Sequence, residues 1–204
     1  MEIQRIDTYA DSRFSECALF QHGCFLVEGK PYEIEIISDF EAVVRGEEKE
    51  VYLKIIEEFR FYAPHITKFY NSRGNIIKEY STVFIKTISL EEIQPSQFYV
   101  DEEKIFAIQK FVHSANDIII PVMPYKGRYI SLDGHTRLYY AVLNEWKAVR
   151  AVVESSDVYI FDFVKEAQKR EIYTPQDIKM VSHSEYEKKW EYPKVCVNLQ
   201  TDVR

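Results

Sequence analysis

Residues 127–153 read GRYISLDGHTRLYYAVLNEWKAVRAVV and combine the patterns of a strand, a helix and a second strand. Residues 129–132 are typical of a strand, apolar residues recur at helical spacing over 135–145, and 148–153 form a short apolar run. The pentapeptide Asp133-Gly134-His135-Thr136-Arg137 is therefore expected to join a strand to the start of a helix. This junction decides the predicted fold, because it orders the elements on both sides of it.

Each residue of this junction offers chemistry suited to a phosphate. The start of a helix leaves backbone N–H groups unpaired and carries partial positive charge, and Gly134 would let an anion approach closely. Thr136 adds a hydroxyl donor, His135 a switchable donor or acceptor, and Arg137 an always-charged planar fork. Asp133 could cap the helix, orient Arg137, hold a metal-bound water or receive a proton. The alternative is a plain helix cap in which Arg137 folds back onto Asp133.

The pattern around the junction predicts an α+β domain. Residues 83–88 and 118–123 are typical of strands, and an apolar stripe behind acidic residues indicates a helix near 102–114. The resulting order is strand, helix, strand, strand, helix, strand. It predicts one mixed sheet over residues 84–153, with two leucines of the junction pointing into its core, Leu132 and Leu138.

Residues 88–154, and above all the stretch quoted first, resemble the ParB/sulfiredoxin-like superfamily. Its members share a small α/β core whose turn binds nucleotide phosphates, and they include chromosome-partition proteins, sulfiredoxins and free serine kinases. The variant Asp-Gly-His-x-Arg is most similar to the serine kinases. The resemblance implies a catalytic role for Asp133, and nucleotide contacts from the rest of the turn and a nearby serine: Gly134, His135, Thr136, Arg137 and Ser96.

The chain departs from two branches of this superfamily. Sulfiredoxins carry a catalytic cysteine at the position that His135 occupies here. Partition proteins carry an adjacent arginine pair and a downstream helix-turn-helix domain, whereas here Thr136 precedes Arg137 and about fifty residues follow the core. We therefore expect neither sulfinic-acid reduction nor chromosome segregation.

A third departure concerns the base of the serine kinases, a glutamate that follows a Pro-His pair after the first core strand. The counterpart here is Pro95-Ser96-Gln97. Gln97 could orient a hydroxyl but cannot accept its proton, so transfer would depend on phosphate positioning, a metal or Asp133. We expect Gln97 to lie beside the Asp133 turn. The nearby acids are interpreted as surface carboxylates: Glu91, Glu92 and Asp101.

The chain is expected to have three parts. Residues 1–82 form an amino-terminal α+β lobe of unknown role, residues 83–155 the ParB/sulfiredoxin-like core, and residues 156–204 a helical carboxy-terminal extension. The lobe is predicted to contain hairpins around residues 24–37 and 65–80. Between them lies a helix that ends before Pro64 and has an apolar stripe, Val51, Ile55, Ile56 and Phe59.

The extension carries two helical signals. Four apolar residues share one helix face, and Thr174-Pro175 is typical of a helix start. A further short helix is predicted near Trp190. The four residues of the apolar face are Val158, Phe161, Val164 and Ala167.

Composition disfavours several partners. The formal net charge of −7 disfavours nucleic-acid binding, which depends on Lys and Arg neutralising phosphates. No stretch approaches the roughly 18 apolar residues that a membrane span needs, so we expect a cytoplasmic protein without membrane association. The cysteines lack the spacing of metal ligands, so we expect buried thiols and no zinc site: Cys17, Cys24 and Cys196.

These observations favour a nucleotide-binding ParB-like protein that acts as a small-molecule phosphotransferase on a free amino acid. It would use ATP or ADP with Mg²⁺, and its partners would be the nucleotide and the small-molecule substrate. The alternative is a non-catalytic module that senses a nucleotide or metabolite, with the amino-terminal lobe as its readout. A nucleic-acid-processing role is the third candidate. The acceptor, the nucleotide base and the oligomeric state stay open.

Overall fold

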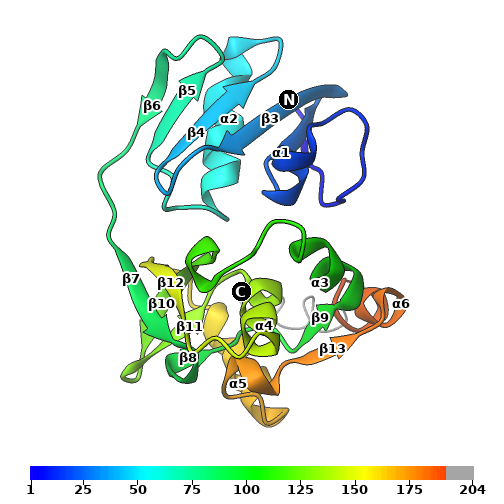
Figure 1. Cartoon of the computed structure of the whole chain (residues 1–204), viewed down its shortest axis with the longest axis vertical. Helices are drawn as coiled ribbons and strands as arrows, with labels where there is room; N and C mark the ends of the chain where they lie inside the picture. The colour runs from blue at the N-terminus through cyan, green and yellow to red at the C-terminus, as the bar shows by residue number, and fades with distance from the viewer. Residues whose placement is uncertain (192–204) are drawn as a thin grey trace. The chain divides into compact units, whose positions relative to one another are not determined.

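The computed structural model describes residues 1–191. The chain divides into two compact units, Met1–Phe84 (unit 1) and Ile85–Arg204 (unit 2), whose elements are labelled in Figure 1. Each unit combines helices with a sheet of its own, so the predicted α+β class is confirmed.

Unit 1 is a six-stranded sheet whose strands follow one another in chain order. Neighbouring strands are antiparallel except β4 and β5, which are parallel and are connected by the helix α2. Its elements are β1 (Ile3–Arg5), α1 (Glu16–Phe20), β2 (Cys24–Val27), β3 (Lys30–Ile36), β4 (Glu41–Arg45), α2 (Lys49–Arg60), β5 (Lys68–Asn71) and β6 (Ile76–Glu79).

The predicted hairpins and helix of unit 1 are confirmed. The apolar stripe of α2 packs against one face of the sheet in a single buried cluster. The helix ends at Arg60, before Pro64. The first hairpin turns at Glu28 and Gly29, because both adopt the positive φ (50° and 80°) that suits a two-residue turn.

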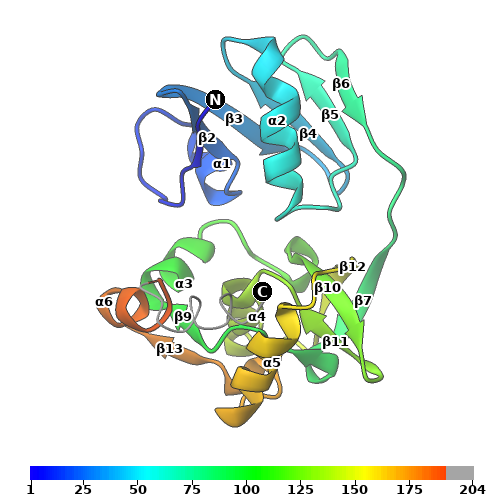
Figure 2. The same ribbon diagram turned by 180° about the vertical axis from the view of Figure 1, so that it is seen from behind.

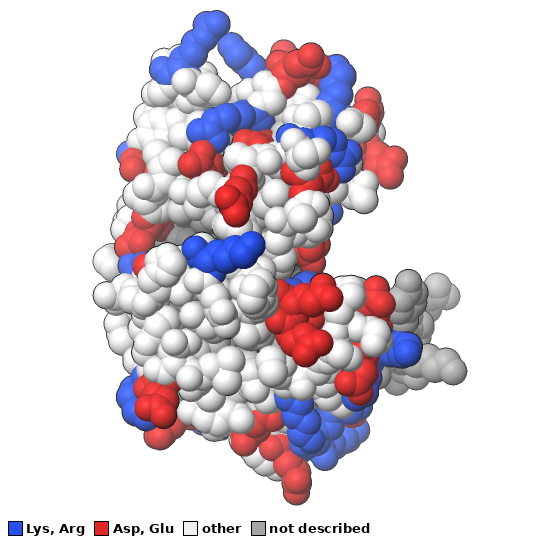
Figure 3. Space-filling model, turned by 45° about the vertical axis from the view of Figure 1, so that its right-hand side comes forward, with Lys and Arg blue, Asp and Glu red and all other residues white. Residues whose placement is uncertain are grey.

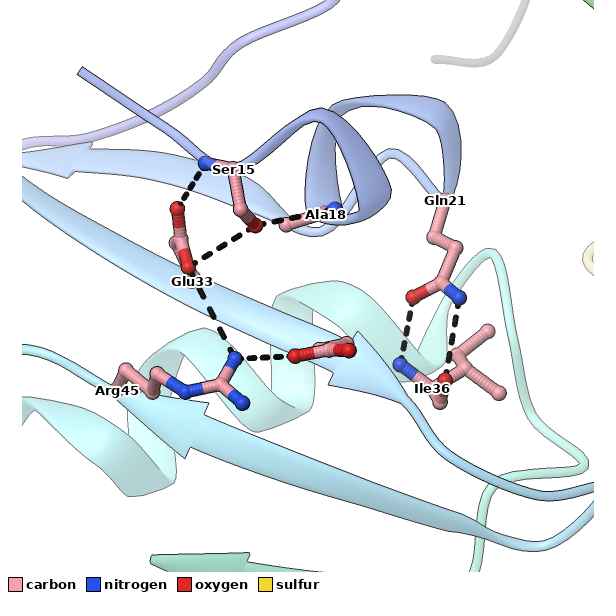
Figure 4. Close-up of polar contacts among 7 residues, drawn as sticks. Ser15, Ala18, Gln21, Glu33, Ile36 and Arg45 are labelled. Carbon is pink, nitrogen blue, oxygen red and sulfur yellow. Dashed lines mark hydrogen bonds and ion pairs between the residues drawn. The ribbon is translucent and has the colours of Figure 1, made fainter. Parts of the chain in front are cut away.

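Helix α1 was not predicted, and polar contacts attach it to β3 (Figure 4). Ser15 caps the helix by accepting a hydrogen bond from the Ala18 N–H, and its own N–H donates to Glu33 on β3. The Gln21 amide bonds both backbone groups of Ile36. Cys24 is buried as expected, but Cys17 on this short helix is exposed, which corrects that prediction. Cys196 lies outside the described residues.

Unit 2 contains the predicted mixed sheet, with five strands in the order β7-β12-β10-β11-β8. The pairs β10–β12 and β11–β8 are parallel and the others antiparallel. The elements from its start to the last strand of this sheet are β7 (Ile85–Ser89), β8 (Ile93–Gln94), β9 (Tyr99–Asp101), α3 (Glu102–Ile108), β10 (Ile119–Tyr125), β11 (Arg128–Ser131), α4 (His135–Leu143) and β12 (Ala148–Val153).

The two core helices differ in how closely they follow the prediction. Helix α4 starts at His135 as predicted, and Leu138 is fully buried. Helix α3 ends at Ile108 rather than near residue 114, because the chain continues in turns that still bury Val112. Leu132 is only partly buried and packs on a smaller cluster around Ile130, which corrects its predicted core position.

The extension is only partly helical. Helix α5 (Ile160–Lys169) packs on the sheet through Ile160 and Val164, and its position is seen in Figure 2. Thr174-Pro175 starts a single 3-10 turn (Pro175–Asp177) rather than a helix, because the Asp177 carboxylate closes the turn on Thr174. The chain then forms β13 (Lys179–Val181), which pairs in parallel with β9, and α6 (His183–Tyr186).

Candidate functional site

Strand β11 enters α4 through the α4 turn, residues 132–137. Gly134 is the residue before the helix, and its φ of 82° and ψ of 22° lie in the left-handed region. A Cβ at this position would lie 2.6 Å from Cγ2 of Ile120. Glycine is therefore required both by the backbone conformation and by the close approach of β10. It also brings no side chain that could cap the N–H groups of the first helical turn.

Asp133 and Arg137 lie together at the mouth of the α4 turn. Nη2 of Arg137 is 3.3 Å from Oδ2 of Asp133, and the side chains are 25% and 40% exposed for Arg137 and Asp133 respectively. Nη1 of Arg137 donates to the carbonyl of Ile119 at 2.8 Å. The folded-back arginine is thus the arrangement present in this structure. One nitrogen anchors the guanidinium to β10, and the other remains at the mouth of the turn.

His135 points into the interior, and the residue is only 5% exposed. Its Nε2 accepts a hydrogen bond from the Ser96 N–H at 3.1 Å and lies 2.9 Å from Oγ of Ser131. Burial lowers the pKa of His135 to about 4, so the ring is neutral near pH 7. The prediction that His135 offers a switchable donor or acceptor to a ligand is therefore corrected for Nε2. This atom is already hydrogen-bonded inside the protein, where it joins Ser96 to the α4 turn.

The segment Pro95-Ser96-Gln97 lies beside the α4 turn through Ser96. The Ser96 hydroxyl is buried and donates to the Ser131 carbonyl at 2.7 Å. Nε2 of Gln97 donates to the Tyr99 carbonyl at 2.6 Å and to the Tyr186 hydroxyl at 3.0 Å. The Gln97 amide is therefore directed to β9 and α6. Thr136, in the first turn of α4, is partly exposed.

Asp101 is 1% exposed, so its interpretation as a surface carboxylate is wrong. Its Oδ1 caps α3 by accepting from the Glu103 N–H at 2.9 Å, and its Oδ2 lies 2.6 Å from Nδ1 of His183. The capping role follows a recognisable pattern, an aspartate ahead of two acidic residues. No local pattern could reveal His183 as its partner, because the two residues are 82 positions apart. Glu91 and Glu92 are exposed, as predicted.

Comparison with known proteins adds little to this geometry. No model of a protein family and no curated protein matches the chain. Among solved structures, protein Atu1540 from Agrobacterium tumefaciens is similar with a TM-score of 0.36 and 16% identity. The match covers 48% of this chain and 62% of that chain. A likeness of this extent does not establish a shared fold.

The surface carries charges of both signs. Acidic and basic side chains are interspersed on the face of the molecule seen in Figure 3.

Within residues 1–191, no three His, Cys, Asp or Glu side chains gather in a way that could hold a metal ion. No helix of the described chain has both the length and the apolar character needed to cross a membrane.

Proposed function

We propose that unit 2 binds the phosphates of a nucleotide at the α4 turn and transfers a phosphoryl group to a small-molecule hydroxyl, such as that of a free amino acid. The observation that carries this proposal is the start of α4. A left-handed glycine, Gly134, precedes a helix of nine residues, and Asp133 and Arg137 lie partly exposed beside it. Free N–H groups and the helix dipole favour an anion at such a position.

Arg137 can contact a phosphate at small cost. Its contact with Asp133 joins two partly exposed groups at 3.3 Å, and pairs of this kind contribute about 0–1 kcal/mol. A phosphate would replace that contact with another charge-assisted hydrogen bond. While Nη2 exchanges Asp133 for the phosphate, the hydrogen bond from Nη1 to the Ile119 carbonyl would hold the guanidinium in place.

The residues at the turn fit the Mg²⁺ that such a reaction uses. Mg²⁺ prefers oxygen ligands and is usually held by one or two carboxylates together with substrate phosphates. Asp133 supplies one carboxylate at the mouth of the turn. When bound there, the metal would neutralise phosphate charge. Asp133 would hold it, and Arg137 would stabilise charge on the transferred group.

The second candidate is a non-catalytic nucleotide- or metabolite-sensing module. Gln97 favours it, because an amide cannot take a proton from an acceptor near neutral pH. Its Nε2 is moreover used in bonds to Tyr99 and Tyr186, which is a structural role. A sensing module would bind a nucleotide at the same turn without turnover.

Ligand-dependent melting tests the binding step that both candidates share. A panel of nucleotides with and without Mg²⁺ should contain one that raises the melting temperature. A ligand at 100 times its dissociation constant stabilises the fold by about 2.7 kcal/mol. Turnover of the bound nucleotide would then favour the phosphotransferase, and binding without turnover the sensing module. No shift with any nucleotide would contradict both.

Arg137→Ala should weaken the affinity for that nucleotide by about 1.5–3 kcal/mol, because a charge-assisted hydrogen bond to phosphate is lost. Isothermal titration calorimetry of both proteins measures this. Arg137→Lys should recover only part of the affinity, since an ammonium group lacks the planar fork. The matched control is Arg73→Ala, an exposed residue of unit 1. Unchanged affinity in a folded Arg137→Ala protein would move the phosphate site elsewhere.

A further inference from the structure

Asp101 and His183 form a pair in which a buried carboxylate orients an exposed imidazole. Oδ2 of Asp101 contacts Nδ1 of His183 at 2.6 Å, and the His183 side chain is 45% exposed. A carboxylate hydrogen-bonded to Nδ1 places the ring proton on that nitrogen. The lone pair of Nε2 is then free to accept a proton, as in the histidine of a catalytic triad.

The pair is connected to the α4 turn by one short segment. Ser96 bonds His135 of the turn, Gln97 bonds Tyr186 of α6, and Asp101 bonds His183 of α6. Asp101 follows Ser96 by five positions, so their Cα atoms are at most about 17 Å apart. Gln97 occupies the position at which the serine kinases have their basic glutamate. By its bond to Tyr186, the Gln97 amide helps to hold α6, the helix that carries His183.

The charges around His183 favour its protonated form. Its pKa is raised, first by the hydrogen bond to Asp101 and further by Glu103 and Glu187. Oε1 of Glu187 lies 3.6 Å from Nε2, in an exposed pair that a substrate can displace. Two lysines of the same region lie over aromatic rings, Lys104 over Tyr186 and Lys189 over Tyr99.

We infer that His183, positioned by Asp101, is the general base that deprotonates the acceptor hydroxyl in the proposed phosphoryl transfer. The inference rests on the proposed function. The hydroxyl proton passes to Nε2 of His183, and the acceptor oxygen bonds to the terminal phosphorus. The bond from phosphorus to its bridging oxygen breaks, and the electron pair leaves with the shortened nucleotide. His183 then releases the proton to water.

The other candidate bases of unit 2 are less suited to this step. His135 is buried and its Nε2 accepts a bond from Ser96. Gln97 has no proton-accepting form near neutral pH. Asp133 lies beside Arg137 and is assigned to the metal. His183 combines an accessible nitrogen with an orienting carboxylate.

The test measures nucleotide turnover with ATP and Mg²⁺, with free serine or water as acceptor, in the full chain. His183→Ala should lower the turnover number about 100- to 10,000-fold. The melting shift with ATP should remain, and imidazole in solution should restore part of the rate, which a structural lesion would not allow. His113→Ala, at an exposed histidine of unit 2, is the matched control and should keep full activity.

The pH profile gives an independent readout. In the wild type, turnover should rise with pH through a value above about 6.5, because the active base is the neutral ring and its pKa is raised. Asp101→Asn should move this rise to lower pH and reduce the maximum rate.

The outcomes separate the two proposals. Wild-type turnover that His183→Ala leaves unchanged would overturn the base assignment and keep the phosphotransferase. A large loss in His183→Ala that imidazole does not restore, with the pH profile unmoved in Asp101→Asn, would also overturn it. Binding of ATP without turnover by the wild type would overturn the base and favour the sensing module. Absence of binding would overturn the proposed function itself.

Discussion

Gly134→Ala should lower the free energy of unfolding of unit 2 by about 2–5 kcal/mol. A left-handed backbone costs a residue with a side chain about 1–2 kcal/mol, and overpacking in a core costs about 1–3 kcal/mol more. Both penalties apply, because φ is 82° and the new Cβ would lie 2.6 Å from a methyl of Ile120. Ile120 is fully buried and cannot move away freely.

Denaturation followed by tryptophan fluorescence measures this loss. The chain has two tryptophans, Trp146 and Trp190, and both belong to unit 2. The matched control is Gly127→Ala, because Gly127 has a similar φ of 77° but no atom within 4 Å of the place that a Cβ would occupy. It should show only the backbone penalty. Equal losses in the two variants would contradict the close approach of Ile120.

Acidification should destabilise unit 2 by about 3 kcal/mol between pH 6.5 and pH 4 through His135 alone. Burial lowers the pKa of His135 to about 4 in the folded chain, while the unfolded chain has a pKa near 6.5. Below pH 6.5 the unfolded state therefore binds a proton that the folded state does not. The part of the free energy of unfolding that depends on neutral His135 is therefore fully present above pH 6.5 and is lost as the pH falls toward 4.

Denaturant unfolding at a series of pH values, followed by the same fluorescence, measures this slope. His135→Gln should remove the His135 part of the slope, and it should also destabilise unit 2 at pH 7 because the buried Ser96 N–H loses its acceptor. His113→Gln, at an exposed position, should retain the slope. An unchanged slope in His135→Gln would show that the ring does not titrate as a buried group.

Elements that depend on neighbouring residues could be predicted well. The start of α4 follows from Gly134 between a strand pattern and a helical pattern. The α2 stripe follows from three-four spacing, and the hairpin of β2 and β3 from Gly29 between two strand-like runs. In each case the signal lies within a few residues, so local backbone preference and periodicity are sufficient.

The three-residue strands β1 and β13 could not be predicted in this way. Their periodicity is too brief to distinguish from a loop. Each forms because an adjacent strand supplies hydrogen-bond partners. For β13 that partner is β9, which lies far away in the chain, and so the tail was expected to be helical.

The same distinction divides the candidate site. The α4 turn is local, and residue types and spacing were enough to predict it. The Asp133–Arg137 contact joins residues four positions apart at a helix start, and that spacing indicated it only as the alternative to an arginine that contacts phosphate. The inward direction of His135 depends on Ser96, 39 positions away, and the Asp101–His183 pair joins residues 82 positions apart. Such contacts are set by which strands pair and which helices pack, because only the folded chain brings their atoms within bonding distance.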